Sequence, residues 1–171
     1  MSRRSSIQLL SRKSMTSTLL SVRSATPDDA SIIADFNIRM AMETEALALD
    51  QSIIFPGVRA VFDDPSRGRY FVAESGKQVV GCLMITHEWS DWRNGDIWWI
   101  QSVYVRPDFR RRGVFSALYR HAANAARAAK AVGVRLYMEE ENSTAQATYQ
   151  KLGMKLTHYR VLEEMFQNDR S

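Results

Sequence analysis

The chain has 171 residues, of which 45% are hydrophobic and 25% are charged, a size and composition that fit one globular domain with a sizeable core. No run of about 18 apolar residues occurs, so the sequence predicts no transmembrane helix. The formal net charge is +4, but Arg3, Arg4, Arg12 and Lys13 account for all of it, and the neutral remainder argues against a nucleic-acid-binding surface.

Residues 1–18 form a basic, serine-rich segment without acidic residues, and we expect it to lie outside a folded domain at 19–171. This composition is typical of a disordered extension, or of a start upstream of a true first residue at Met15, and it also resembles a mitochondrial targeting segment. The only cysteine, Cys82, lies in an apolar run and suits a reducing compartment. We therefore expect a cytoplasmic protein, with import into mitochondria through the basic segment as the alternative.

One strand, two helices and three further strands are predicted in order along the first two thirds of the chain. Thr26 and Pro27 are typical of a helix start, and a second helix is predicted over roughly 50–62, broken at Pro56 and Gly57. The turn residues Ser75 and Gly76 indicate a hairpin. Strands are predicted at 19–24, 69–74, 78–87 and 96–105.

The last third continues this pattern. An apolar stripe predicts a helix that begins near Gly113 and ends near Gly133. A strand is expected at 134–138, a helix at 144–152, and one or two closing strands at 155–166. The order of elements predicts an α/β (α+β) domain with a largely antiparallel start.

The segment Arg110–Phe115 joins a strand to a helix and suits anion binding. The first amides of a helix lack intrahelical partners, and the helix dipole adds positive potential there. Gly113 lets a ligand approach the backbone closely, and Arg110, Arg111 and Arg112 can pair with phosphate oxygens. Taken alone, the segment fits a solvated arginine cluster at an ordinary helix start equally well.

Two motifs in order resemble the GNAT superfamily of N-acetyltransferases over about residues 20–166. The family pattern Arg/Gln-x-x-Gly-x-Gly/Ala falls on Arg110, Gly113 and Phe115, where Phe115 replaces a small residue and is expected to turn into the core beside Leu118 and Tyr119. A second pattern, Asn-x-x-Ala followed by Tyr and then Gly-Phe, falls on Asn142, Ala145, Tyr149, Gly153 and Met154.

The resemblance implies a mixed, mostly antiparallel central sheet of six to seven strands, flanked by about four helices and splayed between the fourth and fifth strands. It implies acetyl-CoA as the acyl donor, no metal, a small-molecule or peptide amine as the partner, and in many members a homodimer. The residues implied to bind the CoA moiety are Val103, Tyr104, Val105, Arg110, Arg111, Arg112, Gly113, Val114, Phe115 and Asn142, the last of which would equally well only cap its helix.

The resemblance also implies a catalytic role for Tyr149 as the proton donor to the CoA sulfur. The family often places a basic Glu on the fourth strand, but the strand here has none, so we take Glu88 as the candidate base. Gln101 cannot accept a proton, although it can hold a water. Acidic and aromatic side chains suit an amine cation, and the substrate candidates are Glu43, Glu45, Trp89, Asp91, Trp92 and Gln101.

Other functions remain open at this stage. The loop and strand around the tryptophans look like the diamine acetyltransferase branch, although that branch carries acids where this chain has Gln101 and Ser102. A protein lysine or N-terminal acetyltransferase keeps the same chemistry. A non-catalytic acyl-CoA sensor keeps only the fold, and an interaction protein would use the tryptophans as an apolar patch.

Overall fold

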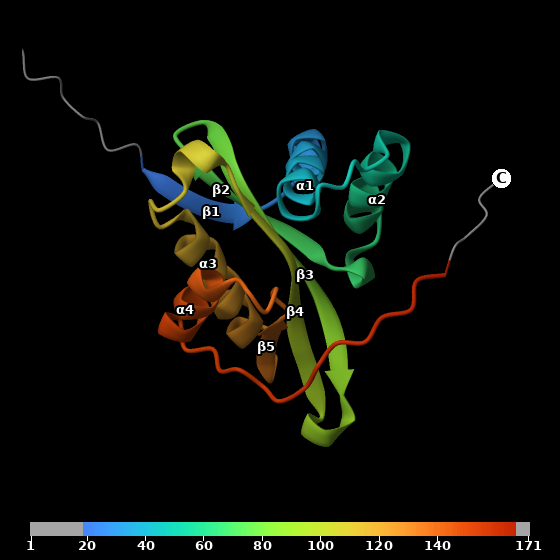
Figure 1. Ribbon diagram of the computed structural model, residues 1–171, viewed down its shortest axis with the longest axis vertical. Coiled ribbons are helices and arrows are strands. Elements are labelled where there is room, and N and C mark those ends of the chain that lie inside the picture. Colours follow the sequence, from blue (N-terminus) through green and yellow to red (C-terminus); the bar gives the residue numbers. More distant parts are fainter. Residues whose placement is uncertain (1–18, 167–171) are drawn as a thin grey trace, which may run out of the picture.

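The computed structural model describes residues 19–166, so the predicted basic segment at 1–18 lies outside the described residues. Its centre is one five-stranded sheet in the order β1-β2-β3-β4-β5. The first four strands are antiparallel neighbours, and β5 runs parallel to β4 (Figure 1). The strands are β1 (Leu20–Ser24), β2 (Arg69–Ser75), β3 (Gln78–Ser90), β4 (Gly95–Val105) and β5 (Gly133–Leu136).

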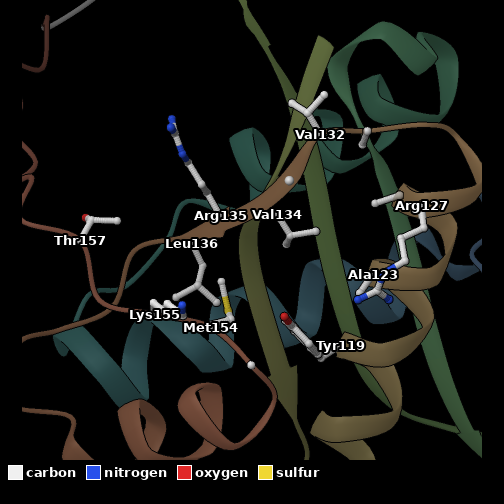
Figure 2. A pocket seen from close by; sticks show the side chains of 14 residues that line it. Tyr119, Ala123, Arg127, Val132, Val134, Arg135, Leu136, Met154, Lys155 and Thr157 are labelled. Atoms are coloured by element: carbon white, nitrogen blue, oxygen red, sulfur yellow. The ribbon is translucent and has the colours of Figure 1, made fainter. Parts of the chain in front are cut away.

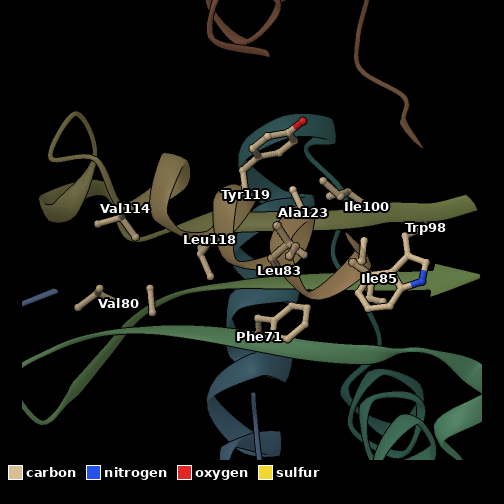
Figure 3. Close-up of a cluster of buried hydrophobic side chains, with 13 residues drawn as sticks. Phe71, Val80, Leu83, Ile85, Trp98, Ile100, Val114, Leu118, Tyr119 and Ala123 are labelled. Atoms are coloured by element: carbon tan, nitrogen blue, oxygen red, sulfur yellow. The ribbon is translucent and has the colours of Figure 1, made fainter. Parts of the chain in front are cut away.

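Four helices cover the two faces of the sheet (Figure 1). The helices are α1 (Ala30–Glu45), α2 (Gln51–Asp63), α3 (Val114–Ala128) and α4 (Ser143–Lys151). Helices α1 and α2 share one apolar cluster with the sheet, and α3 packs on the opposite face in a second cluster, where Leu118 lies among Leu83 and Ile85 (Figure 3). Short 3-10 turns occupy Pro27–Asp29, Pro65–Arg67, Asp91–Arg93 and Pro107–Phe109.

Ion pairs link β1 to β2 and to the turn before α1. Arg23 on β1 donates to both carboxylate oxygens of Asp29, at 2.7 and 3.0 Å, and to Glu74 on β2. Asp29 is buried, and its hydrogen bonds from Arg23 hold the pKa of its carboxyl below the ordinary value. This cluster fixes the entry of α1 against the edge of the sheet.

Two predictions about the elements were wrong. Helix α2 continues through Pro56, because a proline in the second turn removes only the bond to the carbonyl of Ser52, which is exposed to water. The sheet has five strands among residues 19–166 rather than six or seven. Residues 155–166 form no strand, since no neighbouring strand pairs with them, and their apolar side chains such as Leu162 are exposed.

The last two strands separate part of the way along. β4 pairs with β5 only from Ile97–Gly133 to Ile100–Leu136, so the rest of β4, from Gln101 to Val105, has no strand on that side. This is the splay predicted between the fourth and fifth strands. The pairing of β4 with β3 shifts at the same place, because Ile100 faces Ile85 while Ser102 faces Met84. Gln101 is therefore the extra residue of a β-bulge.

Within residues 19–166, none of the helices combines the length and the apolar character that crossing a bilayer requires.

Candidate functional site

The turn before α3 presents main-chain donors to open space. Within residues 19–166, Arg111, Arg112 and Gly113 donate no backbone hydrogen bond, and the N-cap residue Gly113 supplies no side-chain cap. The amide of Ala117 is the first to bond within the helix, to the carbonyl of Gly113, so the amides before it in α3 have no partner in the helix. A Cβ built on Gly113 would meet no atom within 4 Å.

Left-handed backbone produces this turn. Gly113 has φ of 81° and Arg111 has φ of 60°, a region that glycine enters without the strain that a side chain brings. Arg110 ends a 3-10 turn, where its amide bonds to the carbonyl of Pro107 at 3.3 Å. The chain therefore enters α3 at Gly113 with the first amides lacking a main-chain partner, and amides of this kind suit an anion.

The three arginines of the turn have different surroundings. Arg110 folds back, donating from Nε to the carbonyl of Val105 at 2.9 Å and forming an ion pair with Glu43. Arg111 and Arg112 take part in none of the hydrogen bonds or ion pairs among the described residues, and Arg112 lies over the ring of Phe109 at 5.3 Å. Arg111 and Arg112 therefore supply positive charge that is free to meet an anion, whereas Arg110 holds the turn.

Glu43 lies at the end of α1 and joins that helix to the turn. Besides Arg110, it accepts a hydrogen bond from the hydroxyl of Tyr104 on β4 at 2.9 Å, and Arg110 lies 5.6 Å from the centre of the Tyr104 ring. The hydrogen bond from Arg110 lowers the pKa of Glu43. Glu45 is exposed two residues further along. The contacts of Glu43 are those of a residue that positions the turn.

The free edge of β4 offers further amides. Arg106 donates its backbone N–H to the carbonyl of Val80 on β3 at 3.0 Å. Because hydrogen bonding alternates along an antiparallel strand, the N–H groups of Val103 and Val105 point away from β3 and toward the side where β5 is missing. Val103 and Val105 pack their side chains against the α3 cluster. The edge of β4 and the turn thus each present main-chain donors, separated by the 3-10 turn in which the amides of Phe109 and Arg110 are already bonded.

Tyr149 on α4 lies against the first turn of α3. Its ring meets the ring of Phe115 edge to face, at 5.3 Å between centroids, and Phe115 also lies 6.5 Å from Tyr119. Burial raises the pKa of the Tyr149 phenol. No buried side-chain oxygen or nitrogen of the described residues lacks a partner, and no described residue bonds the Tyr149 hydroxyl, so that hydroxyl reaches open space. Phe115 packs on the α3 cluster as expected.

Asn142 is the N-cap of α4. Its Oδ1 accepts a hydrogen bond from the amide of Ala145 at 3.0 Å. Of the two roles that the sequence left open for Asn142, the structure shows the capping role.

Glu88 belongs to a polar cluster on the face of the sheet that also carries α1 and α2. Its Oε1 accepts from Arg135 on β5 at 2.8 Å, and its Oε2 accepts from the indole N–H of Trp99. Nearby, Gln101 donates from its amide nitrogen to Thr86 at 2.7 Å, which leaves the amide oxygen of Gln101 free to accept. Both oxygens of Glu88 are thus occupied, and this favours a holding role over proton abstraction.

The remaining substrate candidates gather at the tip of the β3–β4 hairpin. Trp89 and Trp92 are exposed, and Asp91 accepts a hydrogen bond from the backbone of Trp92 at 2.8 Å. These three residues follow Glu88 at the end of β3 and in the 3-10 turn after it. The structure does not bring them together with Glu43, Glu45 or Gln101.

A cavity of about 390 Å³ lies elsewhere, between the second half of α3, β5 and residues 153–157 (Figure 2). Tyr119 and Arg127 line its α3 side, and Val134 and Leu136 line its β5 side. The turn at residues 110–113, which we call the anion turn, precedes the start of α3, so this cavity is separate from it. Among the described residues, no group of three or more His, Cys, Asp or Glu side chains is placed to hold a metal ion.

Sequence reasoning did not identify Arg135 or Tyr137. Tyr137 follows β5 and its ring lies 6.1 Å from that of Trp99. A basic residue inside a short apolar strand was the only signal for Arg135, and its partner Glu88 is 47 positions away.

Comparisons with known proteins agree with this geometry. The model of the acetyltransferase (GNAT) family matches residues 38–154. No curated protein sequence matches the chain at a significant level. Among solved structures, a possible acetyltransferase from Clostridium difficile 630 is 42% identical, with a TM-score of 0.80, over 88% of this chain and 99% of that one.

More distant structures share the fold. The aminoglycoside N-acetyltransferase AAC(6')-Iy, solved in complex with CoA, is 14% identical with a TM-score of 0.72, over 86% of this chain and 95% of that one. The ribosomal-protein-alanine N-acetyltransferase from Brucella melitensis biovar Abortus 2308 is also 14% identical, with a TM-score of 0.69, over 86% of this chain and 100% of that one.

Proposed function

The chain belongs to the GNAT family of acetyltransferases, and we propose that it transfers the acetyl group of acetyl-CoA to a primary amine of a small molecule or peptide. One observation carries the proposal. The main-chain amides from Arg111 into the first turn of α3 have no main-chain partner, and the space at Gly113 is open. Phe115 in that first turn contacts the ring of Tyr149, whose hydroxyl has no partner among the described residues.

The residues of the turn fit a CoA diphosphate. Helix-start amides and the helix dipole favour a phosphate, and Arg111 and Arg112 are without a carboxylate partner among residues 19–166. The turn and Gly113 would hold the diphosphate, while the free edge of β4 from Val103 to Val105 would hold the pantetheine arm by main-chain hydrogen bonds. Arg110, which donates to Glu43 and to Val105, would keep the turn in place.

Acetyl-CoA supplies an acetyl group already activated as a thioester. The N–H of Val103 is a donor on the free edge of β4, and it can stabilise the negative charge that develops on the thioester carbonyl oxygen. A phenol has an ordinary pKa of about 10 and is protonated at neutral pH, and burial raises the pKa of Tyr149 further. Tyr149 therefore holds a proton that it can pass to the departing sulfur. The oxygen of Gln101 can accept an N–H of the amine or hold a water.

The amine must arrive, or become, neutral before it attacks. Glu43 is a weak base because its pKa is lowered by Arg110, and both oxygens of Glu88 already accept hydrogen bonds. We therefore propose that the amine attacks in its neutral form and that its nitrogen then releases one proton to a water on Gln101. Tyr149 regains from solvent the proton that it gives to the sulfur when the C–S bond breaks. Glu88 serves to hold Arg135.

Release of free CoA thiol from acetyl-CoA in the presence of a panel of amines tests the proposal. Tyr149→Phe should lower kcat by about 10²-fold, the lower range for a general acid, with little change in the KM for acetyl-CoA. Tyr119→Phe is the matched control, since Tyr119 is also buried with a raised pKa but lines the separate cavity.

The outcomes separate the alternatives. Thermal stabilisation by CoA without thiol release would point to a sensor. Absence of both would favour an interaction protein, and equal losses in the two variants would refute the role of Tyr149.

A further inference from the structure

A strip of polar and aromatic side chains crosses three strands on the face of the sheet that carries α1 and α2. Glu88 bonds to Trp99 and Arg135, Gln101 bonds to Thr86, and Tyr137 packs against Trp99. None of these six residues belongs to either apolar cluster. The strip is therefore a surface that the fold does not need for its core.

Arg135 is the residue of the strip with unused binding capacity. Its guanidinium has five N–H donors, and among the described residues only its Nη1 is engaged, by Glu88 at 2.8 Å. The side chain is 37% exposed. Figure 2 shows it extending from β5 on the side away from Leu136, as alternation along a strand requires. Glu88 fixes the guanidinium and leaves its other donors facing solvent.

A guanidinium held in this way is suited to a carboxylate. Its planar donors bind a carboxylate with two parallel hydrogen bonds, and the anchoring by Glu88 reduces the side-chain entropy that binding would cost. The aromatic rings of Trp99 and Tyr137 beside it can cover the apolar part of a ligand.

The position of Arg135 relates the strip to the reaction. Arg135 on β5 lies opposite Trp99 on β4. The next pair, Ile100 with Leu136, is the last between these strands, and Gln101 follows Ile100 directly. Two residues along a strand span about 7 Å. Gln101 also lies one strand across from Arg135, about 5 Å away, so a ligand that contacts both side chains has its two polar ends several ångström apart.

We propose that the acetyl acceptor is an amine that also carries a carboxylate, and that Arg135 binds this carboxylate while the amine lies at Gln101. The inference rests on the proposed function, since it names the acceptor of that reaction. The span favours a side-chain or peptide amine over an amine attached beside its own carboxylate. Glu88 is then a positioning residue that acts through Arg135.

Two acceptors that differ only in the carboxylate provide the test. Lysine and cadaverine have the same terminal amine, but cadaverine lacks the carboxylate. With the full chain, acetyl-CoA and a thiol-release assay, we expect kcat/KM for lysine to exceed that for cadaverine at least tenfold. A lysine dipeptide with a free C-terminus, compared with its amide, shows whether the carboxylate belongs to a free amino acid or to a peptide.

Variants assign the preference to Arg135. Arg135→Gln should abolish the preference for lysine over cadaverine in kcat/KM and leave the KM for acetyl-CoA unchanged. Glu88→Gln should weaken the preference in part, through KM rather than kcat, because Arg135 is then held less firmly. Arg120→Gln, an exposed change on α3, is the matched control and should retain the preference.

Two results would overturn the inference. If cadaverine reacts as well as lysine, and the peptide amide as well as the free peptide, the protein does not recognise the carboxylate. The proposed acetyl transfer would still stand. A carboxylate preference that survives in Arg135→Gln would remove Arg135 from its recognition. No thiol release with any amine would instead refute the proposed function itself, and this inference with it.

Discussion

Gly113→Ala tests the anion turn most directly, because the added methyl group would stand where a diphosphate must approach. Gly113 has φ of 81°, so an alanine there costs about 1–2 kcal/mol of backbone strain. The methyl group itself meets no protein atom within 4 Å, so it adds no clash within the protein. We therefore expect a modest loss of stability without ligand and a much larger loss of CoA affinity.

A matched control separates these two effects. Gly153 also has a positive φ, 95°, and open space at its Cβ position, but it follows α4 rather than preceding α3. Gly153→Ala should lose the same stability as Gly113→Ala and bind CoA as the unmodified protein does. A difference between the two variants then reports only on the turn.

Thermal unfolding with and without CoA supplies the measurement. CoA at about 100 times its Kd adds about 2.7 kcal/mol, which for a chain of this size raises Tm by about 5–11 °C. A tenfold weaker Kd leaves about 1.4 kcal/mol at the same CoA concentration, or about 3–6 °C. Equal CoA-induced shifts in Gly113→Ala and Gly153→Ala would refute the assignment of the turn.

Two further results are expected from groups outside the reaction. Asp29→Asn should lower the free energy of unfolding at neutral pH by about 2 kcal/mol, since it weakens charged hydrogen bonds from Arg23. The pKa of Asp29 is lowered in the folded protein. The contribution of Asp29 to stability is therefore complete above the unfolded pKa of about 4 and is lost as the pH falls through the folded pKa. Denaturant titrations at several pH values should therefore show the two proteins converging in acid, and a constant difference would contradict this reasoning. Burial raises the pKa of the Cys82 thiol to about 12, so a thiol reagent at pH 8 should find no reactive cysteine in the folded protein and one after unfolding; a rapid reaction of the folded protein would show that Cys82 is accessible.

The elements that the sequence predicted are those whose signals are local. Thr26 and Pro27 start a helix through their own backbone preferences, and the apolar spacing of α3 matches the face that it buries. Residues 155–166 also have apolar side chains, but a strand exists only when another strand pairs with it, and this condition cannot be inferred from the segment alone. Pro56 was misjudged because its cost depends on which carbonyl it leaves without a partner.

The candidate site divides in the same way. Gly113 and the amides after it act through the backbone, so their position in the sequence is enough to predict an anion site. Phosphate binding by Arg110 stays a prediction, whereas its contact with Glu43, 67 positions away, is one that no short sequence pattern indicates. The pairing of Glu88 with Arg135 is of the same kind.

The bulge at Gln101 links the two halves of the proposed site. A bulge bends its strand and increases the local twist, and here it lies immediately after the last pair of β4 and β5. The same residue therefore contributes to the opening between the strands, where the acyl donor would lie, and presents its own amide on the face that carries Arg135. Acceptor recognition and donor binding then share one local feature of β4, and a substitution that keeps the bulge, such as Gln101→Ala, should change acceptor turnover with little change in the KM for acetyl-CoA. A large rise in that KM would show instead that Gln101 takes part in holding the donor.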